Sequence, residues 1–389
     1  MMSILIVYIV MLIFSINADD DDSKTCPCSD TSLCQPLSEN AINSNNGKSL
    51  IFTNAVNSTN QGKYWDFDKI GAWAPFNHLG PNYPTAQELY CKAHSKNIPV
   101  YTWGYESWDG GSCPVTKFYS WALTGNSNVY DKDAVNDWAS ETASCVIEKG
   151  FDGILLDMEG IGGPPLGPES MLDAIYYAIC TLKQELTKKL SYSKIYWTAD
   201  TGPYFPYEDL TTDGCVDMWI DMAYDWCVAQ ELNIDYRNRA NSPLPYINTV
   251  DDTIVPTYTK TYNVPLDKLG VAFPWYGCQF NCTIMDENGP YLGCVQAELL
   301  GTQPTFDQVI DKWLPAATSD VVYNDTAVAM LVNSQIDGYP QQVWYDDDTT
   351  LKKKYDEALN AGVKLVGMWT VDMVDEHADT AEKFWNALP

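Results

Sequence analysis

Short runs of β-branched and aromatic residues recur along this chain, and longer stretches with helical periodicity or turn residues separate them. Such runs are typical of buried strands, whereas apolar residues three or four positions apart indicate helices. The runs that fit strands cover residues 49–56, 70–76, 99–105, 151–159, 194–200, 216–225, 269–276 and 363–372. Because strands that alternate with helices pair in parallel, and eight such units close most economically into a ring, the pattern predicts an α/β fold of the (β/α)8 TIM barrel type.

Two features of the segments between these strands add to that prediction. The clearest helices are expected over residues 86–96, 132–149 and 168–189. The segment 278–340, between the seventh and eighth strands, is too long for a simple crossover. It holds three cysteines, several Gly and Pro residues and one expected helix, residues 305–314. We interpret it as a disulfide-containing insertion beside the active face of the barrel.

The fourth predicted strand is apolar and ends in acidic residues. Residues 155, 157 and 159 share one face of this strand because side chains alternate along it. The carboxyl ends of barrel strands form the catalytic face, so Asp157 and Glu159 are expected to project into a cleft. A salt bridge to a neighbouring base is the alternative, but 52 acidic residues face only 23 basic ones. We therefore interpret these two acids as functional.

The N-terminal part reads as a leader followed by a cysteine-rich segment. An apolar run over residues 4–14 is followed by small residues and an acidic stretch, so residues 1–18 are predicted to be a secretory signal peptide. The run is shorter than the roughly 20 residues that a membrane span needs. Residues 19–47 form the cysteine-rich lead, and residues 48–389 form the barrel domain with its insertion. The expected localisation is the secretory pathway, with the lysosome and the extracellular space left open.

Twelve cysteines, an even number, indicate disulfides formed in an oxidising compartment. Spacing does not reveal their pairing. Cys26 and Cys28 are conceivable metal ligands, but disulfides are the better interpretation, and we expect no metal and no cofactor. Asn57, Asn281 and Asn324 lie in N-glycosylation sequons, which are consistent with secretion.

The composition limits the partners. A formal charge of −29 makes nucleic acid and anionic membranes poor partners. Aromatic residues make up 13% of the chain, and their planes can stack on the weakly polar faces of sugar rings, although most will serve the core. We expect a monomer that binds an oligosaccharide and, after signal cleavage, does not associate with a membrane.

The end of the fourth strand resembles the D-x-x-D-x-D-x-E signature of family-18 glycoside hydrolases. Asp152, Asp157 and Glu159 are in place, and Leu155 stands where the second Asp is usual. Further motifs resemble the di-N-acetylchitobiase branch of that family. They lie at residues 26–28, 33–36, 88–96, 274–277, 342–346 and 367–369. The likeness extends over nearly the whole chain after the leader.

The resemblance implies a retaining mechanism in which the substrate's own acetamido oxygen is the nucleophile. Glu159 would be the general acid and then the base, and Asp157 would hold the acetamide N–H. Tyr224 would support the acetamido carbonyl. The expected substrate-binding residues are Asp225, which bonds the sugar or Glu159, and Trp369, whose indole stacks against the sugar, while Asp152 has a supporting role. Apart from the resemblance, Trp275 is a further candidate for substrate binding, with packing at the rim or in the core as the alternative. The substrate would be β-1,4-linked N-acetylglucosamine in chitobiose cores of N-glycans or in short chito-oligosaccharides.

Leu155 departs from the family pattern, because it cannot share a proton with Asp157 as an acid at that position does. We expect this to change the pH profile and not to abolish turnover. Two other functions stay open. One is a chitinase or endo-glycosidase that acts within longer chains, and the other is a catalytically weak or inactive chitinase-like lectin. Lectins of this fold generally lack the acid that Glu159 provides here, which favours catalysis.

Overall fold

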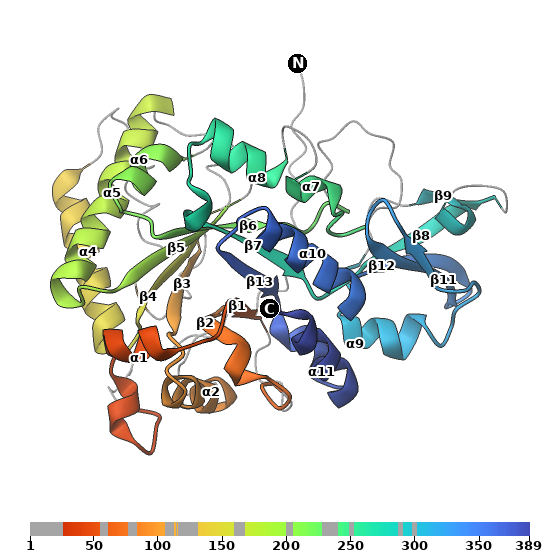
Figure 1. Ribbon diagram of the computed structural model, residues 1–389, viewed down its shortest axis with the longest axis horizontal. Coiled ribbons are helices and arrows are strands. Elements are labelled where there is room, and N and C mark those ends of the chain that lie inside the picture. The colour runs from red at the N-terminus through yellow and green to blue at the C-terminus, as the bar shows by residue number, and fades with distance from the viewer. Residues whose placement is uncertain are drawn as a thin grey trace.

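A computed structural model describes residues 26–54, 61–76, 84–105, 113, 115, 131–158, 168–199, 205–227, 240–248, 253–286, 291–297 and 302–389. Eight strands form one sheet of parallel neighbours in the order β2, β1, β13, β7, β6, β5, β4, β3. A parallel bridge between Trp73 and Val100 links the two ends of this order, so the sheet comes close to a closed barrel (Figure 1). The predicted TIM barrel is confirmed.

Each barrel strand lies within one of the predicted runs. The strands are β1 (Ser49–Thr53), β2 (Ile70–Pro75), β3 (Tyr101–Tyr105), β4 (Gly153–Asp157), β5 (Lys194–Ala199), β6 (Met218–Met222), β7 (Leu269–Pro274) and β13 (Leu365–Trp369). The apolar runs continue past the ends of the paired segments, which explains why the predicted ranges are longer.

Helices surround the barrel (Figure 1). The three expected ones are present as α2 (Pro84–Ser95), α4 (Lys132–Glu148) and α5 (Pro168–Lys189). The others include α1 (Glu39–Ser44), α6 (Tyr207–Thr212), α7 (Pro245–Asn248), α8 (Ile254–Pro256), α10 (Asp348–Asn360) and α11 (Ala378–Ala387). Side-chain caps begin three of them. Ser38 accepts a hydrogen bond from the Ala41 N–H at α1, Asp131 accepts from backbone N–H groups in the first turn of α4, and Asp347 forms a capping box at α10.

Alternation along the strands divides the core into two layers. Inward-facing side chains such as Phe52, Trp103 and Leu155 fill the barrel interior. Outward-facing ones such as Trp197 and Trp219 are buried in the larger outer layer that includes the helices. Burying one large apolar side chain contributes roughly 1.5–3 kcal/mol, so the outer layer dominates the stability of the fold.

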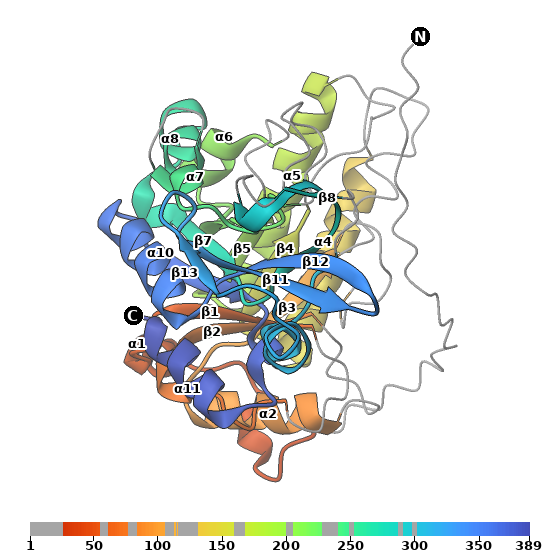
Figure 2. The same ribbon diagram turned by 90° about the vertical axis from the view of Figure 1, so that its right-hand side faces the viewer.

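The predicted insertion between the seventh and eighth barrel strands is present as a five-stranded antiparallel sheet in the order β10, β11, β12, β8, β9. Its strands are β8 (Cys278–Met285), β9 (Cys294–Ala297), β10 (Val322–Asn324), β11 (Ala329–Ile336) and β12 (Tyr339–Tyr345). The expected helix 305–314 begins as α9 (Phe306–Gln308) and continues as a π-helix over Val309–Trp313. Figure 2 shows this sheet from its own side, with barrel strands behind it.

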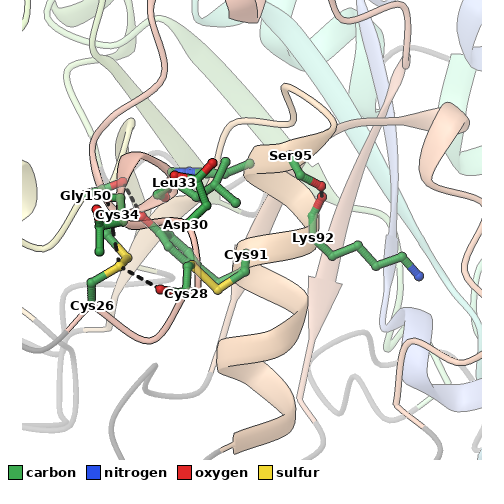
Figure 3. The surroundings of a disulfide bond; sticks show 12 residues. Cys26, Cys28, Asp30, Leu33, Cys34, Cys91, Lys92, Ser95 and Gly150 are labelled. Atoms are coloured by element: carbon green, nitrogen blue, oxygen red, sulfur yellow. Dashed lines mark hydrogen bonds between the residues drawn. A yellow bond between two sulfur atoms is a disulfide. The ribbon is translucent and has the colours of Figure 1, made fainter.

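All twelve cysteines form disulfides, in the pairs 26–34, 28–91, 113–145, 180–215, 227–278 and 282–294. The sulfurs of Cys26, Cys28 and Cys34 lie within 4.8 Å of one another, but all three are bonded to cysteines, which argues against the metal alternative. Figure 3 shows how Cys28 connects the lead to α2 through Cys91.

In the part of the chain that the structure describes, no helix is long and apolar enough to cross a membrane. The expected signal peptide and the sequon at Asn57 lie outside that part.

Candidate active site

Asp157 is the last residue of β4 and lies at the carboxyl end of the barrel. Its side chain is only 5% exposed, and Leu155 is fully buried one inward position below it. Two side chains from neighbouring strands hold the carboxylate. The Trp103 Nε1–H donates to Oδ2 at 3.2 Å, and the Thr198 hydroxyl lies 2.6 Å from Oδ1. Asp157 is therefore oriented from both sides at the top of the interior.

Tyr224 and Asp225 follow β6 at the same end of the barrel. Asp225 has a left-handed backbone with φ of 64°. Its N–H donates to Asn241 Oδ1 at 2.7 Å, which helps to hold this conformation. Tyr276 Oη and Gln303 Nε2 both donate to Asp225 Oδ1 at 2.5 Å. Burial raises the pKa of Asp225, and these two hydrogen bonds oppose the shift.

An aromatic wall joins these acids. The Trp103 ring contacts Phe76 with centroids 3.7 Å apart, and Phe76 meets Trp369 edge to face at 5.0 Å. Trp369 stacks with Tyr224 at 6.2 Å and 22°. Tyr224 in turn contacts Tyr276, the donor to Asp225. Trp369 and Tyr224 are partly exposed, so their rings are available to a ligand that enters from the carboxyl face.

These contacts bring Asp157, Tyr224, Asp225 and Trp369 of the predicted site together. Glu159 lies outside the described residues, two positions beyond the end of β4, and its role stays a prediction. Sequence reasoning missed the supporting side chains Trp103, Thr198, Phe76, Tyr276, Asn241 and Gln303. Alternation along the strands could have placed several of them, such as Trp103 and Tyr276, on the inward side, but it does not reveal which partner each one contacts.

Trp275 lies in the outer layer of the core and not beside the aromatic wall. It is 1% exposed, its Nε1–H donates to Tyr355 Oη at 3.0 Å, and its ring meets Phe384 and Trp385 of α11 edge to face. It faces the outer layer because neighbouring residues of a strand point to opposite sides, and Tyr276 points to the inside. The structure thus favours packing over substrate binding for Trp275, which lies between the barrel and its helices.

Asp152 lies at the other end of β4, away from the site. It accepts hydrogen bonds from the backbone N–H groups of Leu37 and Val100 at 2.7 and 2.8 Å. His94 Nε2 is 3.1 Å from its second oxygen, and His94 Nδ1 is 2.7 Å from the carbonyl oxygen of Leu33. Asp152 thus connects the N-terminal lead to the base of the barrel, and the support it provides is structural.

We expect Trp275→Phe to lower the free energy of unfolding by roughly 2 kcal/mol, because it leaves space in the outer layer and removes the bond to Tyr355. The affinity for the chito-oligosaccharides that the family resemblance implies should stay within about twofold of wild type. Trp369→Phe should instead weaken that affinity about tenfold, because a smaller ring stacks on less of the expected sugar. Thermal melts and calorimetric titration measure the two effects. If Trp275→Phe binds these sugars more weakly than the wild type does, Trp275 belongs to the binding site.

No model of a known protein family matches the chain. The mouse di-N-acetylchitobiase is 24% identical over 386 residues, which cover 93% of this chain and 92% of that protein. The human di-N-acetylchitobiase is 22% identical, with 93% and 88% covered.

Solved structures share the fold. A class V chitinase from Nicotiana tobaccum matches with a TM-score of 0.63 at 13% identity, covering 88% of this chain and 98% of that one. A family-18 N-acetylglucosaminidase from Paenibacillus barengoltzii matches with a TM-score of 0.64 at 13% identity, covering 88% and 100%. A chitinase-like agglutinin from Robinia pseudoacacia matches with a TM-score of 0.58 at 15% identity, covering 78% and 85%. The chain is thus similar along nearly its whole length to the di-N-acetylchitobiases, and it has the barrel fold of the family-18 glycoside hydrolases.

Proposed function

We propose that this protein is a glycosidase that hydrolyses β-1,4-linked N-acetylglucosamine in short chito-oligosaccharides or in the chitobiose cores of N-glycans. The observation that carries the proposal is the unbroken series of contacts from Asp157 through the aromatic wall to Asp225 at the carboxyl end of the barrel. Carboxylates that flank partly exposed aromatic rings fit a sugar, whose faces stack and whose hydroxyl and amide groups hydrogen-bond. Similarity to the di-N-acetylchitobiases supports the substrate class.

The proposed mechanism is retaining and assisted by the substrate. Glu159 protonates the departing glycosidic oxygen while the acetamido oxygen of the sugar attacks the anomeric carbon. Asp157 accepts a hydrogen bond from the acetamide N–H and balances the positive charge that develops on the resulting oxazolinium. The Tyr224 hydroxyl supports the acetamido carbonyl, and Trp369 supports the ring. Glu159, now deprotonated, activates the water that opens the intermediate.

The compartment is a second part of the proposal. Six disulfides fit an oxidising environment, which agrees with the secretory pathway. Within that pathway we propose residence in the lysosome or outside the cell, as a monomeric glycoprotein modified at one or more of Asn57, Asn281 and Asn324.

The experiment is to incubate the purified protein with di-N-acetylchitobiose and with longer chito-oligosaccharides from pH 4 to pH 7.5 and to identify the products. Release of N-acetylglucosamine from the reducing end alone selects the chitobiase. Internal cleavage selects an endo-acting chitinase. The barrel shared with a chitinase-like agglutinin makes binding the second candidate function. A protein that binds these sugars and cleaves none would be a lectin and would contradict the proposal.

Leu155→Asp tests the departure from the family pattern. The new carboxyl would lie directly below Asp157 in the closed interior, so the two groups would share a proton. We expect the acid limb of the kcat/KM profile to move by about one pH unit. Leu155→Asn is the matched control because it has the same shape and polarity but does not titrate. If both variants keep the acid limb of the wild type, the titration of Asp157 does not depend on the side chain at position 155.

A further inference from the structure

Thr198 lies beside Asp157 across the neighbouring strands β4 and β5. The two residues are direct partners in the parallel register. The Thr198 hydroxyl oxygen is 2.6 Å from Asp157 Oδ1 and also 3.1 Å from the carbonyl oxygen of Leu156. Its side chain is almost fully buried, so water does not compete freely for these contacts. The hydroxyl therefore has two hydrogen-bonding partners within reach and only one proton to donate.

The single hydroxyl proton of Thr198 allows two hydrogen-bond arrangements, one for each protonation state of Asp157. When Asp157 is ionised, Thr198 donates its proton to Oδ1. When Asp157 carries a proton, the carboxyl donates to Thr198 Oγ1, and the hydroxyl turns its own proton to the Leu156 carbonyl. The Leu156 carbonyl receives the Thr198 proton only in the second arrangement, and the hydroxyl turns about one bond when Asp157 gains or loses its proton. Trp103 is different, since its Nε1–H can only donate and so favours the ionised carboxylate.

We infer that Thr198 is a positioning residue for Asp157, and that its hydroxyl supports this carboxyl in both protonation states, in place of the third acid that Leu155 does not provide. The inference rests on the proposed function for its catalytic meaning. A retaining, substrate-assisted reaction needs Asp157 to keep its direction while charge develops on the acetamido group. A leucine below Asp157 gives no such support, whereas a hydroxyl at its side does.

Among the described residues, the other titratable side chains that face the interior next to Asp157 are tyrosines, and the carboxyl of Asp225 lies beyond Tyr224, bonded to Tyr276. Tyr101 of β3 and Tyr196 of β5 lie lower in the barrel, and burial raises the pKa of both. Tyr224 lies at the rim, in contact with Trp369. The phenols of Tyr101 and Tyr196 therefore stay neutral in the pH range where a carboxyl titrates. Glu159 lies outside the described residues and is the other carboxyl close in sequence.

The test compares Thr198→Val with Thr198→Ser and with Thr142→Val. Valine has the shape of threonine without the hydroxyl, and serine keeps the hydroxyl. Thr142 in α4 is equally buried, and its hydroxyl has no hydrogen-bond partner within the described chain, so its replacement is the matched control for the loss of a buried hydroxyl. The first readout is the pH titration of the Asp157 side-chain carboxyl carbon by ¹³C NMR, assigned through Asp157→Asn. The second is the acid limb of kcat/KM on di-N-acetylchitobiose.

We expect Thr198→Val to move the titration midpoint of Asp157 upward by about one pH unit, because the bond to the ionised form is about twice as strong as the bond to the neutral form. The acid limb should move with it. Thr198→Ser should restore the midpoint to within about 0.3 units of wild type, and Thr142→Val should not move it. An unmoved midpoint in Thr198→Val, or an equal shift in both Thr198 variants, would overturn the inference. If the wild type cleaves none of the sugars, the proposed function fails, and the carbon titration still decides the role of Thr198.

Discussion

Replacing Glu159 with Gln is expected to lower kcat on di-N-acetylchitobiose by about 10²–10⁴-fold, which is the usual contribution of a general acid. Gln has nearly the shape of Glu, but it cannot give a proton to the departing oxygen or take one from water. The KM should change by less than about threefold, because the aromatic wall and Asp157 remain to bind the sugar. Initial rates with purified variants at the pH optimum measure both quantities.

Glu141→Gln is the matched control for this experiment. Glu141 is an exposed residue of α4, and its replacement changes the net charge by the same amount without touching the carboxyl face of the barrel. Its kcat should equal that of the wild type. Full activity of Glu159→Gln would show that another residue is the general acid. It would also remove the main support for the substrate-assisted mechanism.

The barrel was predictable because its strands follow a simple rule. A strand in a closed barrel is buried on both faces, so it reads as a short apolar run, and each of the eight runs contains one observed strand. The insertion was predictable from its length and its cysteines. Its antiparallel sheet was not, because short paired strands in a long connection resemble loops rich in turn residues.

The candidate site was predictable only where its residues lie in short motifs that can be recognised in the sequence. Asp157 follows from a strand that ends in acids, and Tyr224, Asp225 and Trp369 from the family likeness. Their supports come from other strands and loops. Thr198 meets Asp157 through the stagger of β4 against β5, which one sequence does not reveal. Gln303 of the insertion contacts Asp225, which lies 78 positions earlier in the chain.

The placement of Trp275 has a physical lesson. The sequence left substrate binding and packing open for this residue, and the rule that neighbouring residues of a strand face opposite sides decides between them. The small inward residue Ala272 fixes the parity, which sends Trp275 to the helices and Tyr276 to the site. The parity argument that placed Asp157 and Glu159 together therefore applies at β7 as well.

A buried acidic cluster beside the eighth barrel strand was not foreseen either. Asp375 is 2% exposed and accepts a bond from the Gly62 N–H at 3.3 Å. Asp307 of α9 is similarly buried and accepts one from the Glu376 N–H at 2.9 Å. Burial first, and then the charge of Asp372, raise the pKa of Asp375 to about 8. Burial also raises the pKa of Asp307 to about 6, although the hydrogen bond from the Glu376 N–H and then the nearby His377 oppose this shift.

These shifts make the fold more stable in acid. Below about pH 4, Asp375 carries its proton in both the folded and the unfolded chain. As the pH rises from about 4 to 8, Asp375 ionises only in the unfolded chain, so the folded state loses about 1.4 kcal/mol per pH unit relative to it. The whole loss is on the order of 5 kcal/mol and is complete above pH 8. Asp307 adds a smaller loss between about pH 4 and 6. An acidic compartment would suit such a protein.

Asp375→Asn is accordingly expected to be more stable than the wild type at pH 8 by up to about 5 kcal/mol, and nearly equal to it at pH 4. The amide keeps an oxygen for the Gly62 N–H and has no charge to bury. Denaturant unfolding at half-unit steps from pH 4 to 8 measures the slope of stability against pH, which should flatten in this variant. Asp320→Asn, which removes an exposed carboxyl of the insertion, is the control and should keep the wild-type slope. If Asp375→Asn keeps that slope too, the acid preference of the fold does not come from this cluster, and the summed negative charge of the surface becomes its explanation.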